Sequence, residues 1–174
     1  TNYRTGGRQD YDNDAGTAIT FSGGGATAVT TSGDAVNFDT GDDDSVVTLG
    51  NGSHLTVTTA GGNITAEAGF DGTSDEDLTL DAGAGTVTVG QIGTNVGNGI
   101  DTVDITGNGA VTLKGDITTS GTGDNGNVTI NDSAGSRIDQ SITIDTSAAA
   151  GTIDLDGMSA TGTHYDLTLN AGGG

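Results

Sequence analysis

Short apolar stretches alternate with polar residues at a fixed spacing through the second half of the chain. The apolar pairs recur every 25 residues as Leu78/Leu80, Val103/Ile105, Val128/Ile130 and Ile153/Leu155. A second track follows the same period and consists of Ile92, Ile117, Ile142 and Leu167. Because successive side chains of a strand point to opposite faces, each stretch predicts a short strand with one aliphatic face. Two tracks with one period indicate a structural repeat.

The first half of the chain repeats with a longer period of 28 residues. Its matched positions are Phe21 with Leu49, Val29 with Val57, and Val36 with Ile64. From residue 19 to residue 174 we count about six repeats, each with three short strands. They begin near Ile19, Val47, Leu78, Val103, Val128 and Ile153. Residues 1–18 are predicted to form a polar N-terminal segment.

A repeat of this length predicts one coil of a parallel β-solenoid, or β-helix. A single coil cannot bury its own apolar face, whereas coils stacked about 4.8 Å apart pair every strand with the coils above and below. The 33 glycines suit tight corners, and the absence of proline suits strands that hydrogen-bond on both edges. A β-sandwich would also show alternation, but it gives no reason for one period on two tracks. The predicted fold is all-β, with the handedness left open.

The repeat also predicts which residues of successive coils are neighbours. Ile117, Ile142 and Leu167 should stack on one another, as should Val103, Val128 and Ile153. Two outward columns then read Thr79, Asp104, Thr129, Asp154 and Asp116, Ser141, Asp166. Acids alternate with hydroxyls in both columns, which spaces the carboxylates about two coils apart and limits their repulsion.

The amino-acid composition argues against several classes of protein function. Aromatic residues make up only 3% of the chain, so the buried core is predicted to be thin and aliphatic. Twenty-four acids face four bases, for a net charge of −20, which argues against a nucleic-acid partner. No apolar run approaches the roughly 18 residues of a membrane span, so no membrane insertion is predicted. The absence of cysteine fits an exported bacterial protein.

Several phrases of the sequence resemble large bacterial surface proteins. They are Ser45-Val-Val-Thr-Leu-Gly-Asn-Gly52, Asn127-Val-Thr-Ile-Asn-Asp132 and Ser141-Ile-Thr-Ile-Asp145. The chain is similar, over about residues 17–170, to the passenger regions of filamentous-haemagglutinin-like exoproteins, autotransporters and giant repeat adhesins. The resemblance implies a solenoid architecture and an extracellular or cell-surface location. It implies no specific ligand and no functional residue.

Clustered acids make calcium the metal that the sequence favours. Asp10, Asp12 and Asp14 place carboxylates at alternate positions, as calcium-binding loops do, although Phe21 stands where an EF-hand has its bidentate glutamate. A second cluster consists of Asp42, Asp43 and Asp44, and a further cluster at a predicted corner consists of Asp71 with Asp75, Glu76 and Asp77. Solvated acidic corners are the alternative interpretation of all three clusters, and both interpretations stay open.

An enzyme is not predicted. His54 and His164 are the two histidines and lie on distant coils, and no nucleophile-elbow motif is present. Thr56-x-Thr58 and Thr86-x-Thr88 would lie on one face and resemble the threonine arrays of ice-binding solenoids. Ala28 interrupts that array, so ice binding is less favoured than the main alternative function, calcium-dependent adhesion to surface glycans.

The predicted role is structural: an extracellular rod, filament or surface-layer building block that assembles head to tail. No amphipathic capping helix is visible in the sequence, and the predicted last strand runs to Asn170. The open ends of a coil stack carry unpaired strand edges and exposed core. We therefore expect the coil that begins at Ile19 of one copy to stack on the coil that ends near Leu169 of another. Arg4 and Arg8 can bridge to acidic corners of that neighbour.

Overall fold

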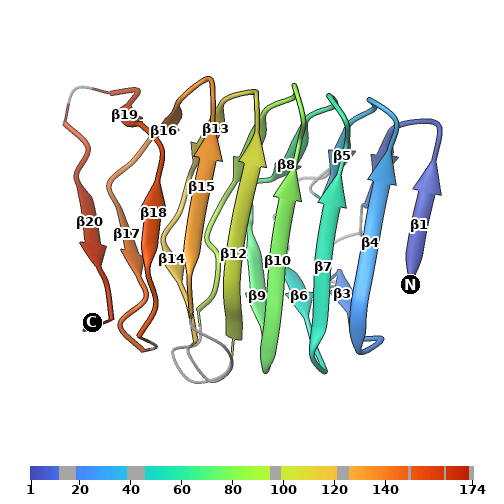
Figure 1. Cartoon of the computed structure of the whole chain (residues 1–174), viewed down its shortest axis with the longest axis horizontal. Helices are drawn as coiled ribbons and strands as arrows, with labels where there is room; N and C mark the ends of the chain where they lie inside the picture. Colours follow the sequence, from blue (N-terminus) through green and yellow to red (C-terminus); the bar gives the residue numbers. More distant parts are fainter. Residues whose placement is uncertain are drawn as a thin grey trace.

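The computed structural model of the chain is an all-β parallel solenoid of about six turns, which confirms the predicted fold class. It describes residues 1–11, 19–38, 46–94, 99–120, 126–148, 150–162 and 164–172. The coils stack side by side along the long axis, and the two ends of the chain lie at opposite ends of the stack (Figure 1). The strands form three faces, called A, B and C here in the order in which each coil visits them.

Within the described ranges, faces A and B each carry seven strands. The order on face A is β1 (Asn2–Thr5), β4 (Gly25–Thr31), β7 (Ser53–Thr58), β10 (Asp75–Asp81), β12 (Gly99–Gly107), β15 (Val128–Asp132) and β18 (Ile153–Leu155). The order on face B is β2 (Gln9–Asp10), β5 (Val36–Asn37), β8 (Ile64–Ala66), β11 (Val87–Val89), β13 (Val111–Leu113), β16 (Ser136–Ile138) and β19 (Met158–Ala160). Every pairing on both faces is parallel, as a coiled path requires.

Face C consists of two shorter sheets that one residue joins. The first contains β3 (Thr20–Phe21), β6 (Val47–Leu49) and β9 (Phe70–Gly72), and the second contains β14 (Ile117–Thr118), β17 (Ile142–Asp145) and β20 (Leu167–Asn170). Ile92 makes isolated parallel bridges to Phe70 on one side and to Ile117 on the other. The apolar track therefore runs along the whole of face C.

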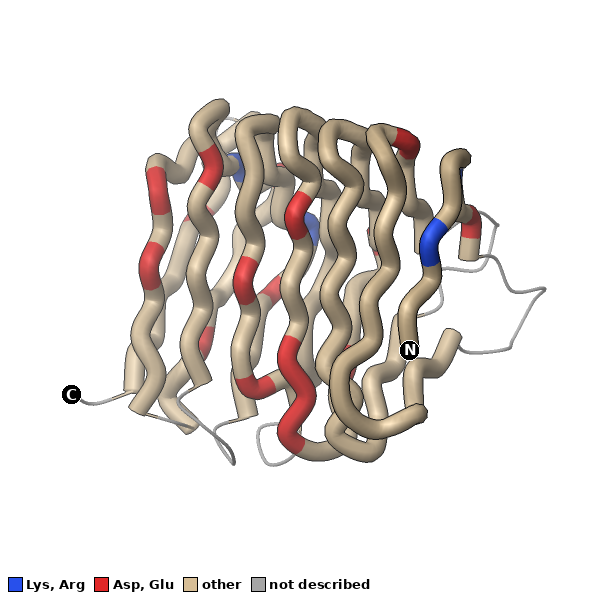
Figure 2. Tube along the Cα trace, turned by 45° about the vertical axis from the view of Figure 1, so that its right-hand side comes forward, with Lys and Arg blue, Asp and Glu red and all other residues tan. Residues whose placement is uncertain are grey.

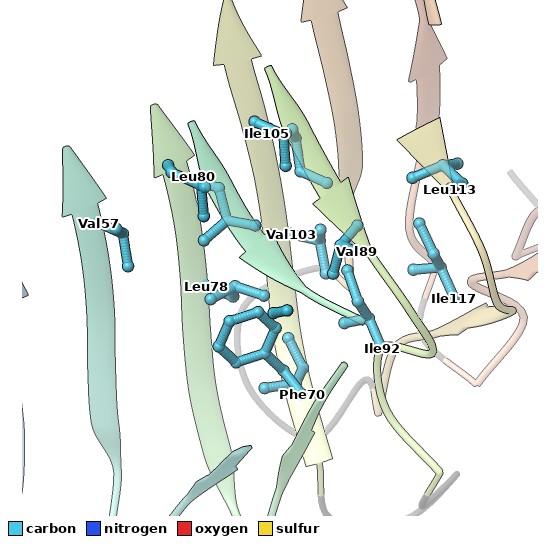
Figure 3. Close-up of a cluster of buried hydrophobic side chains, with 14 of the residues drawn as sticks. Val57, Phe70, Leu78, Leu80, Val89, Ile92, Val103, Ile105, Leu113 and Ile117 are labelled. Carbon is cyan, nitrogen blue, oxygen red and sulfur yellow. The ribbon is translucent and has the colours of Figure 1, made fainter. Parts of the chain in front are cut away.

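Aliphatic side chains from the three faces meet in a continuous core (Figure 3). Leu78 pairs with Val103, Val103 with Val128, and Val128 with Ile153, so the predicted column on face A is confirmed. The strands of this region alternate buried and partly exposed residues, as in β11 and β13. Because burying each such side chain contributes about 1.5–3 kcal/mol relative to exposure, the stacked columns are the main source of stability.

One predicted neighbour pair is wrong by two residues. Ile142 pairs with Leu167 as expected, but Ile117 pairs with Ile144. The preceding coils turn onto face C at Gly90 and Gly115, where an added Cβ would lie 1.9 Å and 2.4 Å from backbone atoms of the coil before. Three residues, including Gly115, lie between Leu113 and Ile117, whereas five residues without a glycine lie between their partners Ile138 and Ile144. We attribute the shift to this wider corner, which places two further residues before the paired position.

Of the two predicted outward columns, one is confirmed and the other is displaced. Thr79, Asp104, Thr129 and Asp154 are neighbours on face A, as predicted. The second column is displaced: Oδ1 of Asp116 accepts a hydrogen bond from the backbone N–H of Thr143, at 2.7 Å, while Ser141 Oγ accepts one from the N–H of Asp166, at 3.0 Å.

Two further expectations change once the faces are known. Thr56 and Thr58 lie in β7 on face A, whereas Thr88 lies in β11 on face B, so the expected threonine array is divided between two faces. The first two coil starts, at Ile19 and Val47, belong to face C, and the later four belong to face A. The strands β1 and β2 lie within the polar N-terminal segment and extend faces A and B.

Candidate functional site

An aromatic cluster fills the core at the N-terminal end of the stack. The ring of Tyr11 stacks on Phe38, with centroids 5.0 Å apart, and lies edge-on to Phe21 at 6.0 Å. Phe38 in turn makes an edge contact with Phe70 at 5.5 Å. These are all three phenylalanines of the chain, and each is buried. The predicted aliphatic core is therefore wrong at this end, where large rings provide the packing.

The first strand lies outside this cluster and exposes its side chains. All four residues of β1 are exposed, and Tyr3 keeps 45% of its surface accessible although it pairs with the buried Val29. Arg8 forms an ion pair with Asp10, with Nε and Oδ1 2.6 Å apart. Arg4 makes no ion pair with any described residue. The N-terminal end thus carries an apolar ring and an available positive charge.

The C-terminal coil exposes the aliphatic core. Inward residues of β15, β16 and β17 are buried, whereas the inward residues of β18, β19 and β20 are at most half-buried. Leu169 is 52% exposed. Each of these last three strands ends its sheet within the described chain, so one edge of each has no strand partner. Exposed edges and uncovered aliphatic residues are the two features that favour addition of further strands.

Hydrogen bonds from side chains attach this last coil to the coil before it. The amide of Asn170 donates to Oδ2 of Asp145 at 3.0 Å, and the N–H of Ser147 donates to Oδ1 of the same carboxylate at 2.8 Å. The hydrogen bonds from Ser147, and then that from Asn170, lower the pKa of Asp145. Oδ1 of Asn127 accepts from both the N–H and the hydroxyl of Thr152, at 2.9 and 3.0 Å.

Charge also differs between the two ends. Arg4 belongs to the first strand, whereas the last coil exposes three carboxylates, Asp154, Asp156 and Asp166. Figure 2 shows a basic residue on the N-terminal strand and acidic residues on the coils near the C-terminus. The two ends therefore have complementary charge and complementary strand edges.

The predicted calcium ligands lie mostly outside the described residues. Asp12, Asp14, Asp42, Asp43 and Asp44 fall in the segments that the structure does not describe. Asp10 is described, and its Oδ1 accepts hydrogen bonds from Arg8 and from the amide of Asn37. Within the described ranges, no group of three or more acidic or histidine side chains is arranged to hold a metal ion. Calcium binding stays a prediction from the sequence.

A different acidic cluster has a structural role that sequence reasoning missed. Glu76 is fully buried, and its carboxylate accepts hydrogen bonds from the backbone N–H groups of Gly52, Thr73 and Ser74 at 2.7–3.0 Å. It therefore joins two coils and supplies acceptors to a turn that would otherwise lack them. The neighbouring Asp77 contacts His54, with Oδ2 and Nδ1 2.9 Å apart. An acid three residues after the turn Gly72-Thr73 was the available signal.

The described surface offers no pocket, and the described chain forms no helix with the length and apolar character needed to cross a bilayer. The candidate functional surfaces are therefore the two ends of the stack and the outer faces of the sheets. Comparisons of the chain with protein-family models, with curated proteins and with solved structures found no match.

Proposed function

We propose that the protein is a structural unit of an extracellular bacterial rod, filament or surface layer, and that its copies join head to tail. The support comes from the two ends of the stack. The coils of a solenoid are joined along its axis by a continuous ladder of hydrogen bonds, and each added coil extends the same ladder. A contact between unlike ends is heterologous, and where successive copies share one axis it produces an open assembly rather than a closed ring.

The observation that carries this proposal is the uncovered C-terminal coil. Leu169 and Tyr165 are among the few large apolar side chains that the described chain exposes. Leu169 continues the aliphatic column of face C directly above Ile144, which is fully buried. A second copy placed there buries the exposed column and pairs the free strand edges at the same time.

Association is measured by sedimentation velocity over a wide concentration range, with negative-stain electron microscopy of the concentrated sample. We expect concentration-dependent oligomers that appear as rods with the width of one solenoid. Leu169→Asp should abolish them, because the substitution places a charge in the contact. Val46→Asp is the matched control, since Val46 is also exposed but lies beside the second strand of face C. A wild-type protein that stays monomeric throughout would refute the proposal.

A further inference from the structure

One outward column of side chains runs the whole length of face A. It begins at Arg4, which pairs with Thr30 of β4. The pairings then pass through Thr30, Thr58, Asp81, Thr106 and Asn131. Asp156 occupies the next position, because Leu155 pairs with Ile130 and the N–H of Asp156 donates to the carbonyl of Ile130 at 2.9 Å. A base therefore begins this column and an acid ends it.

Two inward columns begin and end with apolar side chains that are incompletely covered. Tyr3 begins the column on face A that ends at Leu155. On face C, Ile19 directly precedes Thr20 of β3 and so begins the column that ends at Leu169. Each of these two columns therefore has one incompletely covered apolar side chain at the N-terminal end of the stack and another at the C-terminal end.

We propose that a second copy docks on the C-terminal coil in unbroken register, with its β1 paired to β18 of the first copy. This inference rests on the proposed head-to-tail function and specifies its contact. Arg4 of one copy then lies beside Asp156 of the other. The apolar residues that begin the two inward columns cover Leu155 and Leu169, which end them.

The register follows from the requirements of the two ends. A shift of one residue would turn the inward side chains of the docked strand outward. A shift of two residues would keep the apolar faces together but would separate Arg4 from Asp156. Only the unbroken register satisfies the strand edges, the apolar columns and the ion pair at once.

Engineered cysteines test the register directly, because the chain has no cysteine of its own. Asn2 and Asp154 occupy one outward column and would face each other across the contact, at the Cα spacing of about 4.8 Å typical of paired strands. That spacing is within the range of about 4.4–6.8 Å that a disulfide bridges. Within one chain the two positions are six strand spacings apart, about 29 Å, so no intramolecular bond can form.

The double variant Asn2→Cys/Asp154→Cys should give a ladder of disulfide-linked oligomers after oxidation with oxidised glutathione, seen on a non-reducing gel. The matched control is Asn2→Cys/Thr152→Cys, which places the second thiol two residues away and about 8 Å distant across the contact. We expect little cross-linking of the control. A stronger ladder from the control, or no ladder from either variant while both still associate, would overturn the register.

Charge reversal provides a second test. Arg4→Asp alone and Asp156→Arg alone should each weaken association by about three- to tenfold, because an attraction becomes a repulsion. Mixing the two single variants should restore association, since each provides the missing partner of the other. Wild-type association with no effect of either reversal would refute the inferred contact but leave the proposed function standing. A monomeric wild type would refute both.

Discussion

The two ends of this solenoid differ in the interactions that hold their outermost coils. At the N-terminal end, three phenylalanines and Tyr11 pack against one another beneath the first strands. At the C-terminal end, the inward residues are aliphatic and partly exposed, and hydrogen bonds such as that between Asn170 and Asp145 hold the last coil. The comparison teaches that a rod of equivalent coils can still have direction, because its ends differ in packing and in charge.

The largest expected difference between the ends is in their contribution to stability. Phe38→Ala should lower the free energy of unfolding by about 3–5 kcal/mol, because it leaves a cavity among Tyr11, Phe21 and Phe70. Leu169→Ala should lower it by less than about 1 kcal/mol in the monomer, since Leu169 is already half exposed. Urea unfolding of both variants at low concentration measures the difference. Equal losses in the free energy of unfolding would contradict the expectation that the N-terminal end, with its aromatic cluster, is packed more tightly than the C-terminal end.

Acid should loosen the C-terminal end first. The pKa of Asp145 is lowered by hydrogen bonds from Ser147 and Asn170, so its stabilising contribution is present above the ordinary carboxyl pKa and is lost as the pH falls through the lower, folded value. Native-state hydrogen exchange of β20 should therefore accelerate below about pH 4 relative to β4. Asp145→Asn should show the faster exchange already at neutral pH. Uniform acceleration along the whole stack would contradict this expectation.

Alkali should act on the opposite end. Burial, and secondarily the phenol of Tyr3, raises the pKa of Tyr11 above its ordinary value of 10.0. The stability that the neutral phenol contributes is therefore present below pH 10.0 and is lost as the pH rises through the higher, folded-state pKa. Ultraviolet titration should show one tyrosine that ionises late, together with faster exchange at β2. Tyr11→Phe removes the ionisation and serves as the control. An identical high-pH end of the titration curve in the wild type and in Tyr11→Phe would contradict the prediction.

The smallest expected effect on stability concerns Asp104, which lies between the two ends of the stack. Burial, with a lesser contribution from Asp81, raises the pKa of Asp104 in the folded protein. The stability that this residue contributes is therefore fully present below the ordinary carboxyl pKa and is lost as the pH rises through the higher, folded-state pKa. Asp104→Asn should therefore raise the melting temperature at pH 7 by no more than about 4 °C. The gain should vanish near pH 3. Asp154→Asn, in the same column at the exposed C-terminal coil, is the control.

Periodicity predicted the parts of the fold that repeat. The column of Val103, Val128 and Ile153 follows from the 25-residue spacing because the total length of each of those coils is the same, although single corners within them differ. The pair Ile117 and Ile142 failed because register depends on corner geometry, and a corner without glycine occupies more chain. The sequence pattern locates the strands well but does not determine the width of each corner.

The features that break the repeat were harder to predict. Phe21, Phe38 and Phe70 are unevenly spaced in the sequence and meet only because three different segments converge. Glu76 resembles any acid of a solvated corner until the neighbouring coil supplies the N–H of Gly52. Head-to-tail complementarity, in contrast, could be proposed from Ile19, Leu169 and the two arginines of the polar N-terminal segment, although the residue pairs required the observed register.

Variable corners have a consequence for how such a chain can evolve. On face A, the coil from Ala28 to Thr56 takes 28 residues and the next, from Thr56 to Thr79, takes 23, yet both pairings stay in register. Insertions and deletions at corners can therefore leave the register of face A unchanged, while a single inserted residue within a strand would reverse its two faces. A lineage can thus acquire new surface loops, one corner at a time, without altering the ladder that holds the molecule together.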